Sequence, residues 1–203
     1  MSESLPRCGW AAGSPGECRY HDEEWGMPLV GDRSLFEFLT LEGAQAGLSW
    51  RTVLERRAAY REAFLDYEIE ALAALSDDQL MERLANPGLV RNRLKIQSVR
   101  TNARAALPFI AQPGGLTAFL WAFAPAERNP VRAGPGTVPS ETPESRLMSR
   151  DLRKAGFTFV GPTICYALMQ ATGMVNDHLK TCHRQSVCAA APVLVPDVGS
   201  PHL

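Results

Sequence analysis

The sequence contains no long apolar segment and no targeting signal at its start. No apolar run approaches the roughly 18 residues that a helix needs to cross a membrane. The opening residues, MSESLPRCGW, lack the basic stretch followed by an apolar stretch that marks a secretory signal. We therefore expect a cytoplasmic protein without a membrane partner.

The sequence also lacks an excess of basic charge. It contains 21 Lys and Arg residues against 22 Asp and Glu residues, so its formal net charge is -1. This balance excludes the class of proteins that bind nucleic acid through bulk positive charge. Any contact with DNA must be made by a local basic patch.

Cysteine is scarce as well. The five cysteines are an odd number, and they lack the dense spacing of a secreted disulfide scaffold. Free thiols or metal ligands are expected instead of a disulfide framework, and zinc is the candidate ion.

Internal repeats are absent and alternating, strand-like runs are scarce, whereas helical start and stop signals recur from about residue 32 to about residue 183. A chain of 203 residues, 45% of them hydrophobic, can bury one core. We predict an all-α fold with a single domain over residues 1–187. The stretch after Cys188, AAAPVLVPDVGSPHL, has no pattern of a packed element, so residues 188–203 are predicted to be a disordered tail.

Capping residues predict where several helices begin. Asp32 is expected to N-cap a helix with apolar residues at three- and four-residue steps, and Ser49 is expected to cap the next helix. Ser76 and Gln79 form a capping-box pattern for a short helix that ends near Ala85.

Further helices are predicted in the second half of the chain. A long helix is expected over residues 91–107, and a shorter apolar one after the Pro-Gly-Gly turn at 113–115, whereas the Pro- and Gly-rich residues 126–142 are expected to form a loop. Thr142 is expected to cap a helix that ends at Gly156, and a last apolar helix is predicted over residues 161–173.

Four side chains that can bind zinc lie near the two ends of the chain. They are Cys8, His21, His178 and Cys182. The spacing His178-x3-Cys182 predicts two ligands on one face of a helical turn. Four such ligands leave no coordination position for water, so the predicted ion is structural and joins the termini.

Spacing alone leaves other interpretations of these residues open. The four could be unrelated surface or core side chains, because the two pairs are far apart in the sequence. Cys18 and His183 lie within a few residues of the chosen ligands and are the alternatives to them, whereas Cys165 is expected in the core.

A second feature is a stretch without acidic residues. Between Glu82 and Glu127 the only charged residues are basic: Arg83, Arg91, Arg93, Lys95, Arg100 and Arg104. One interpretation is a surface that faces DNA phosphates, and the other is an ordinary solvated helix face. Within this stretch NPGLVRNRLKI reads as a helix end, a turn at Gly88 and a basic helix start, a layout that can hold phosphate.

A third feature is a carboxylate on an apolar stripe. Glu42 shares its helical face with Leu35 and Leu39, where an apolar residue is expected. It either has an internal partner or faces a pocket and accepts hydrogen bonds from a ligand. Trp10, Tyr20, Trp25 and Trp50 are close in sequence to Glu42 or to the candidate metal ligands Cys8 and His21. Aromatic faces can stack on a flipped-out base, although such side chains are more often core.

Five segments, in this order, resemble the 3-methyladenine DNA glycosylase I family. They are RCGW at 7–10, YHDEEWG at 20–26, LEGAQAGLSW at 41–50, FVGPTICY at 159–166 and VNDH at 175–178. The resemblance covers roughly residues 5–183 and leaves only the tail outside it.

The resemblance implies a helix-hairpin-helix glycosylase fold, in which NPGLVRNRLKI matches the DNA-binding hairpin. The residues implied there are Gly88, Arg91, Arg93 and Lys95. It also implies that Cys8, His21, His178 and Cys182 bind one structural zinc ion, which agrees with the set chosen from spacing.

For the base pocket, the resemblance implies that Glu42 hydrogen-bonds the excised adenine, that Trp50 stacks on it, and that Tyr20 and Trp10 complete the aromatic wall. It implies hydrolysis of the N-glycosidic bond in alkylated double-stranded DNA, without a lysine Schiff base or strand cleavage. A monomer is the default expectation. No aspartate follows FVGPT closely, so Glu42 is the only carboxylate nominated.

One position departs from the family pattern. Glu17 stands where relatives commonly carry an aromatic residue, which puts the affinity and selectivity of the pocket in question. Two other functions compete with the glycosylase: a zinc-stabilised DNA-binding module without activity, and a zinc hydrolase. The hydrolase would need an open coordination position.

Overall fold

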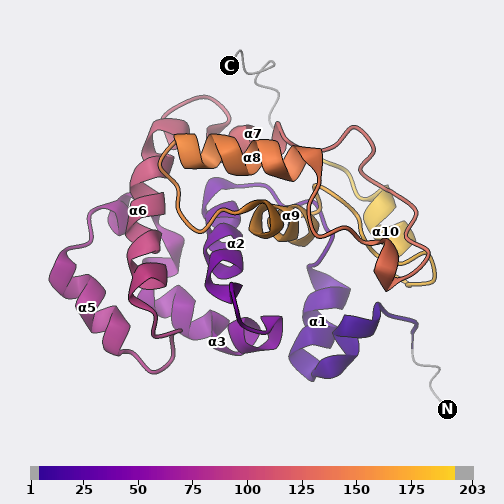
Figure 1. Cartoon of the computed structure of the whole chain (residues 1–203), viewed down its shortest axis with the longest axis horizontal. Coiled ribbons are helices and arrows are strands. Elements are labelled where there is room, and N and C mark those ends of the chain that lie inside the picture. Colours follow the sequence, from indigo (N-terminus) through magenta and orange to yellow (C-terminus); the bar gives the residue numbers. More distant parts are fainter. Residues whose placement is uncertain (1–4, 195–203) are drawn as a thin grey trace.

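The computed structural model describes residues 5–194, and these form an all-helical protein (Figure 1). Its α-helices are α1 (Pro15–Glu23), α2 (Asp32–Gln45), α3 (Trp50–Ala63), α4 (Ile69–Ala73), α5 (Asp77–Ala85), α6 (Arg93–Ile110), α7 (Gly115–Trp121), α8 (Pro143–Lys154), α9 (Pro162–Ala171) and α10 (Gln185–Ala190). Three 3-10 turns, η1 (Gly9–Gly13), η2 (Leu65–Tyr67) and η3 (Pro135–Thr137), join them. Within residues 5–194 no strand is present, only one isolated bridge between Arg132 and Leu179. The all-α prediction is confirmed.

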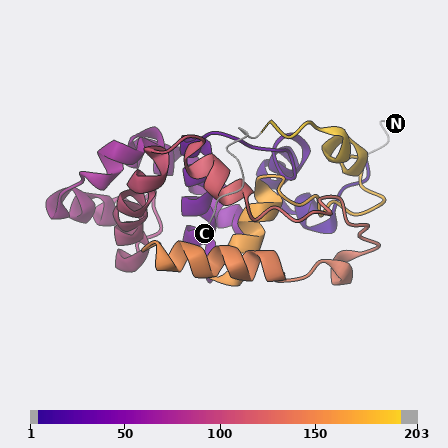
Figure 2. The same cartoon turned by 90° about the horizontal axis from the view of Figure 1, so that it is seen from above.

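Helix α2 forms the centre of the molecule. Every residue from Leu35 to Ala44 is buried, so this helix is enclosed on all sides. Helix α9 packs against it and is itself covered by α8. Figures 1 and 2 show α5 and α6 at one end, and α1 with α10 at the other. Helices α1 and α10, from opposite ends of the described chain, therefore lie on the same side of α2.

Most of the predicted caps are present. The Ser49 hydroxyl accepts a hydrogen bond from Thr52 N at 3.2 Å. Ser76 and Gln79 form the reciprocal capping box, and α5 ends at Ala85 as predicted. Thr142 caps α8.

The cap predicted for Asp32 is wrong. Gly31 is the N-cap of α2, and Asp32 is its first helical residue. The Asp32 carboxylate instead accepts hydrogen bonds from Thr117, at 2.8 Å from the backbone nitrogen and 2.7 Å from the hydroxyl. The N-cap of α7 is Gly114, which has no side chain, so Asp32 supplies the missing acceptor from a distant part of the chain.

The predicted end of the domain also needs correction. Helix α10 runs from Gln185 to Ala190, and Cys188 is fully buried, so the boundary predicted at residue 188 falls inside a packed helix. The burial comes from contacts with Trp25 and Met27, which local sequence patterns do not reveal. Residues 195–203 of the predicted tail lie outside the described residues. No helix of the described part is both long and apolar enough to cross a membrane.

Candidate functional site

A cavity of about 500 Å³ lies where the N-terminal turn, α1, α2, α3 and α9 meet. Its aromatic walls are Trp10, Tyr20, Trp25 and Trp50. Its polar walls are Glu17, Glu42, Gln45, Gln170 and Asp177. All four residues predicted to contact a base, Glu42 with Trp10, Tyr20 and Trp50, thus line one cavity.

The aromatic rings form a connected cluster. The ring centroids of Tyr20 and Trp50 are 5.2 Å apart, and Trp10 lies 6.2 Å from Tyr20 and 5.1 Å from Trp25. Tyr20 is buried, whereas Trp10 is 39% exposed. Flat apolar surfaces of this kind suit a planar ligand such as a base.

Glu42 is a buried carboxyl group without a protein partner. It is 4% exposed, and no described residue forms a hydrogen bond or an ion pair with its carboxyl group. Burial disfavours the charged form and raises the pKa of Glu42 to about 8. The alternative of an internal partner is therefore wrong, and both oxygens are available to a ligand in the cavity.

Asp177, a second acidic residue of the cavity, is held firmly by its neighbours. One carboxylate oxygen accepts from Arg132 Nε at 2.7 Å. The other accepts from the Tyr166 hydroxyl at 2.5 Å and from Gln170 Nε2 at 2.8 Å. With both oxygens occupied, Asp177 fastens the loop that carries Arg132 to α9 and has no role left as a base.

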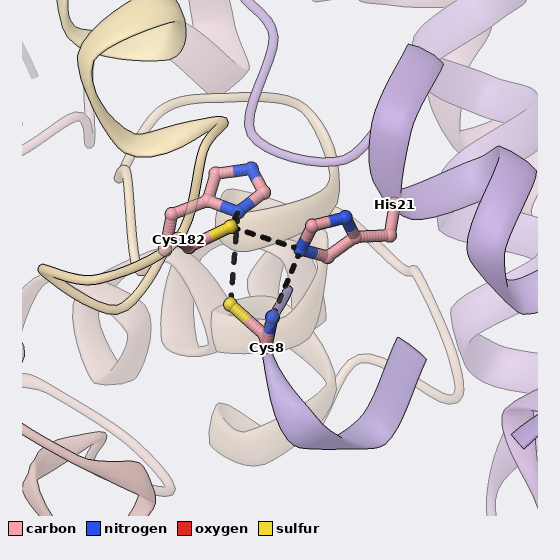
Figure 3. A group of neighbouring side chains, drawn as sticks. Cys8, His21 and Cys182 are labelled. Carbon is pink, nitrogen blue, oxygen red and sulfur yellow. Dashed lines mark hydrogen bonds between the residues drawn. The ribbon is translucent and has the colours of Figure 1, made fainter. Parts of the chain in front are cut away.

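The four predicted metal ligands come together beside the cavity, between the N-terminal segment and the segment before α10. The ligand atoms of Cys8, His21, His178 and Cys182 all lie within 4.8 Å of one another, and all four residues are buried. The Cys182 sulfur is 3.4 Å from His21 Nε2 (Figure 3). It is also 3.4 Å from His178 Nδ1. Two thiols and two imidazoles at these separations can hold one metal ion.

Outer contacts orient the two imidazoles. His21 Nδ1 lies 2.8 Å from an Asp22 carboxylate oxygen, and His178 Nε2 lies 2.9 Å from the Trp25 carbonyl oxygen. The opposite nitrogen of each ring is thereby directed at the cysteines, which is the arrangement that metal-binding histidines usually have. Burial lowers the pKa of His178 to about 4, so this imidazole is neutral, as a ligand must be.

The predicted helical turn that would carry His178 and Cys182 is wrong. His178 and Cys182 do not share a helical turn, because residues 178–182 form an irregular turn closed by a hydrogen bond from Cys182 N to Leu179 O. The alternatives to the chosen ligands bind elsewhere: the Cys18 thiol donates to Ala11 O, and His183 Nδ1 lies 3.0 Å from Pro6 O.

Known proteins agree with this geometry. Residues 10–185 match the methyladenine glycosylase family. The DNA-3-methyladenine glycosylase 1 of Escherichia coli (strain K12) is 40% identical over 179 residues, which cover 88% of this chain and 96% of that protein. The chain belongs to the methyladenine glycosylase family.

Solved structures of glycosylases have the same fold. A crystal structure of 3-methyladenine DNA glycosylase I is 40% identical, with a TM-score of 0.85 over 92% of this chain and 100% of that one. A Staphylococcus aureus 3-methyladenine DNA glycosylase I, solved to show how 3-methyladenine is recognised, is 30% identical, with a TM-score of 0.84 over 89% of this chain and 97% of that one.

In this member of the methyladenine glycosylase family, most of the basic residues after Glu82 serve the fold. Lys95 Nζ donates to Ala44 O at 2.8 Å, near the end of α2, and Arg104 Nε donates to Ala73 O at 2.8 Å, at the end of α4. Arg83 and Arg100 bind the carbonyl oxygens of Ala63 and Leu75 in the same way. Helix C-termini attract cations. Contacts within the fold therefore account for much of the basic charge between Glu82 and Glu127, and no contact with DNA is needed to explain it.

The remaining candidates lie at the α5–α6 turn. Gly88 is part of the turn, where its backbone nitrogen donates to Asn86 Oδ1 at 2.8 Å. Arg91 and Arg93 are exposed, and neither has a side-chain hydrogen bond or ion pair with any described residue. Only these two of the four predicted hairpin residues therefore present a free charge.

Sequence reasoning missed several parts of the glycosylase cavity. Pro135 and Val138 line it from the loop, and Gln45, Gln170 and Asp177 line it from α2, from α9 and from the segment after α9. None of these residues interrupts a local pattern. Glu17 was noticed only as a departure from the family, yet it is 9% exposed and lines the same cavity.

Proposed function

We propose that this chain is a monofunctional DNA glycosylase that releases 3-methyladenine from alkylated double-stranded DNA and leaves an abasic site. The buried carboxyl group of Glu42, unpartnered in an aromatic cavity, carries this proposal. A flipped adenine would stack on Trp50 and Tyr20 while its N–H groups donate to Glu42. The names of the relatives support the same substrate.

Methylation at N3 gives the base a positive charge and makes it a good leaving group. The C1′–N9 bond can therefore break without a strong general acid, and the base departs neutral. Water adds at C1′, and its proton is released to solvent. The protein contributes extrusion of the base and tighter binding of the departing base than of normal adenine. Both carboxylate oxygens of Asp177 accept hydrogen bonds from the protein, which is consistent with a mechanism that uses no aspartate as a base.

We propose that Cys8, His21, His178 and Cys182 hold one zinc ion. The donor set fits Zn²⁺, and four protein ligands fill a tetrahedral shell, so the ion is structural and not a hydrolase centre. It would join η1 and α1 to the segment before α10. Cys8 belongs to this ligand group and also lines the cavity, so the two lie side by side.

We propose that the α5–α6 turn of the helix-hairpin-helix contacts DNA phosphate through its backbone at Gly88 and through Arg91 and Arg93. Lys95 is not part of this proposal, because its side chain donates to Ala44 O near the end of α2. We further propose that the enzyme acts as a monomer in the cytoplasm, where its DNA substrate lies.

Arg91→Gln and Arg93→Gln should each reduce the salt dependence of DNA binding. Removing one ionic interaction with a phosphate lowers the slope of log K against log salt concentration by about 1. The slope is measured by fluorescence anisotropy with a labelled duplex at several salt concentrations.

The matched control is Arg104→Gln on α6, which removes the hydrogen bond to Ala73 O. It should lower Tm by about 2–4 °C, as expected for about 1 kcal/mol in a chain of this size, and leave the slope unchanged. A slope that falls equally in all three variants would argue against the proposed interface.

The activity itself is tested by incubating the protein with methylated duplex DNA and identifying the released bases by chromatography. Wild type should release free 3-methyladenine, and Glu42→Gln and Trp50→Ala should release less. Tight DNA binding without any released base would instead indicate a lesion-binding module. Retention of activity in a chelator, with folding intact, would exclude the zinc hydrolase.

A further inference from the structure

A second cavity, of about 700 Å³, lies between α1 and α3, outside the cavity that contains Glu42. The two helices pack beside each other (Figure 1). Two carboxylates, Glu24 and Glu55, line this α1–α3 groove. They are outnumbered by the arginines of its lining, which are Arg19, Arg51, Arg57 and Arg61. The formal net charge of the chain is -1, so the groove is a basic patch of local extent.

Ion pairs in the groove direct positive charge outward. Arg51 pairs with Glu17, and Arg61 pairs with Glu37. The two arginine side chains are 46% and 53% exposed, whereas their partner glutamates are only 12% and 4% exposed. Coulomb interactions weaken with distance, and the guanidinium groups lie nearer to the solvent than the carboxylates do. An anion that enters the groove therefore meets positive charge first.

Two arginines of the groove have donors that the fold does not use. Arg19 is exposed on α1, and its guanidinium has no hydrogen bond or ion pair with any described residue. Arg51 donates through Nε to Glu17 and through Nη2 to Gly13 O, but its Nη1 donates to no described residue. A guanidinium presents its N–H groups in a planar fork that matches the oxygens of a phosphate. The free donors are thus of the type that binds phosphate.

The first turn of α1 adds to this positive potential. Residues 14–16 line the groove, and they form the N-terminal end of α1. A helix N-terminus carries a partial positive charge that favours anions. The arginines and the helix end therefore act on a bound anion in the same direction.

The groove adjoins the cavity that contains Glu42. Tyr20 lines both of them. The ion pair between Glu17 and Arg51 separates them, because Glu17 lines the cavity and Arg51 lines the groove. A nucleotide whose base has entered the cavity stays attached to its strand through the phosphates on either side. Those phosphates would lie close to the groove.

We propose that the α1–α3 groove binds backbone phosphates of the strand that carries the lesion, next to the flipped-out nucleotide, through Arg19 and Arg51. The inference rests on the proposed function, because it takes alkylated DNA as the ligand. Phosphate contacts fix the position of a strand, and here they would hold it while the base leaves the stack. The groove is separate from the α5–α6 turn, since its residues come from α1 and α3.

The first test measures binding to a labelled duplex that contains a stable abasic-site analogue, so that no base is released. Fluorescence anisotropy at several salt concentrations gives the slope of log K against log salt concentration. Arg19→Gln should lower this slope by about 1, which weakens binding about 5- to 10-fold at 0.1 M salt. Glu55→Gln removes a carboxylate that repels phosphate, so it should tighten binding by roughly 2- to 3-fold.

Arg33→Gln is the matched control. It removes the same charge, and the Arg33 side chain is half-exposed like that of Arg51. Arg33 lies in the first turn of α2, whereas the cavity is lined by Glu42 and Gln45 from the other end of that helix. This variant should keep the salt slope of wild type.

A second test locates the bound phosphate. In a series of duplexes with the same abasic-site analogue, one backbone linkage at a time is replaced by a neutral methylphosphonate. A neutral linkage beside the analogue should weaken binding of wild type about 5- to 10-fold, and it should have little further effect on Arg19→Gln. Arg91→Gln should keep the full sensitivity of wild type to that linkage, because Arg91 belongs to the α5–α6 turn.

The proposal is overturned if Arg19→Gln and Arg33→Gln show the same salt slope. It is also overturned if the linkage that loses its effect in Arg19→Gln lies on the opposite strand or far from the lesion. Failure of the proposed glycosylase function is seen separately, because methylated duplex DNA would then release no free base whatever the salt slope.

Discussion

Glu42→Gln should lower the single-turnover rate of 3-methyladenine release about 3- to 10-fold, because the amide keeps one oxygen acceptor and replaces the other with a donor. The rate is measured on a duplex with a single lesion. DNA binding should stay nearly intact, because Glu42 lies inside the cavity and away from the α5–α6 turn. Unchanged base release in this variant would remove the central support for the proposed function.

The same variant should gain stability relative to wild type as pH rises. Burial raises the pKa of Glu42 to about 8, so the folded state holds a proton that the unfolded chain has already lost. The free energy of unfolding of wild type therefore falls between the unfolded pKa and about pH 8, by at most about 1.4 kcal/mol per pH unit.

Glutamine carries no charge, so the free energy of unfolding of the variant does not fall with pH for this reason. Urea unfolding of both proteins at pH 6 and pH 9 should show the variant catching up with wild type or surpassing it at the higher pH. A difference in stability that does not change with pH would mean that Glu42 is not the destabilising buried acid.

Removal of the proposed zinc ion should cause the largest loss of stability. An ion present at about a thousand times its Kd adds about 4 kcal/mol to the folded state, which corresponds to roughly 8–16 °C in Tm for a chain of this size. Cys182→Ser, and wild type treated with a chelator, should both show a drop of this order. Calorimetry measures the drop, and elemental analysis should find one zinc ion per wild-type chain and less in the variant.

Cys18→Ser is the matched control, because the Cys18 thiol donates to Ala11 O and lies outside the ligand group. It should keep its metal and nearly all of its Tm. Base binding should weaken in the metal-free protein too, since Trp10 of the cavity packs 5.4 Å from the His21 ring. A chelator that leaves the wild-type Tm unaltered would contradict a structural ion.

Local features of the fold were predictable from sequence because local chemistry determines them. Ser49, Ser76 and Thr142 cap helices through groups three residues away, so short windows contain both partners. Asp32 has the same kind of capping side chain but serves α7. A helix N-terminus brought close by tertiary packing competes for such a side chain, and no local pattern reveals that competition.

The site was predictable only in part for a similar reason. Glu42 could be nominated because a carboxylate interrupts an apolar stripe, and the cluster that could hold a metal ion could be nominated because cysteine and histidine are rare in this chain. The basic residues misled, since Lys95 and Arg104 are bound to helix ends that lie far away in sequence. Asp177 and Glu17 break no pattern, and only their partners Arg132 and Arg51 show what they do.

The assembly of the cavity from distant parts of the chain has a consequence during synthesis of the protein. The cavity is lined by residues from Cys8 to Leu179, and the possible metal ligands extend to Cys182. A ribosome adds Leu179 and Cys182 after every other residue that lines the cavity or belongs to this ligand group. A nascent chain can fold α2 against α3 earlier, yet it has neither a complete pocket nor a complete ligand set. A truncated translation product therefore has no finished base pocket with which to act on DNA.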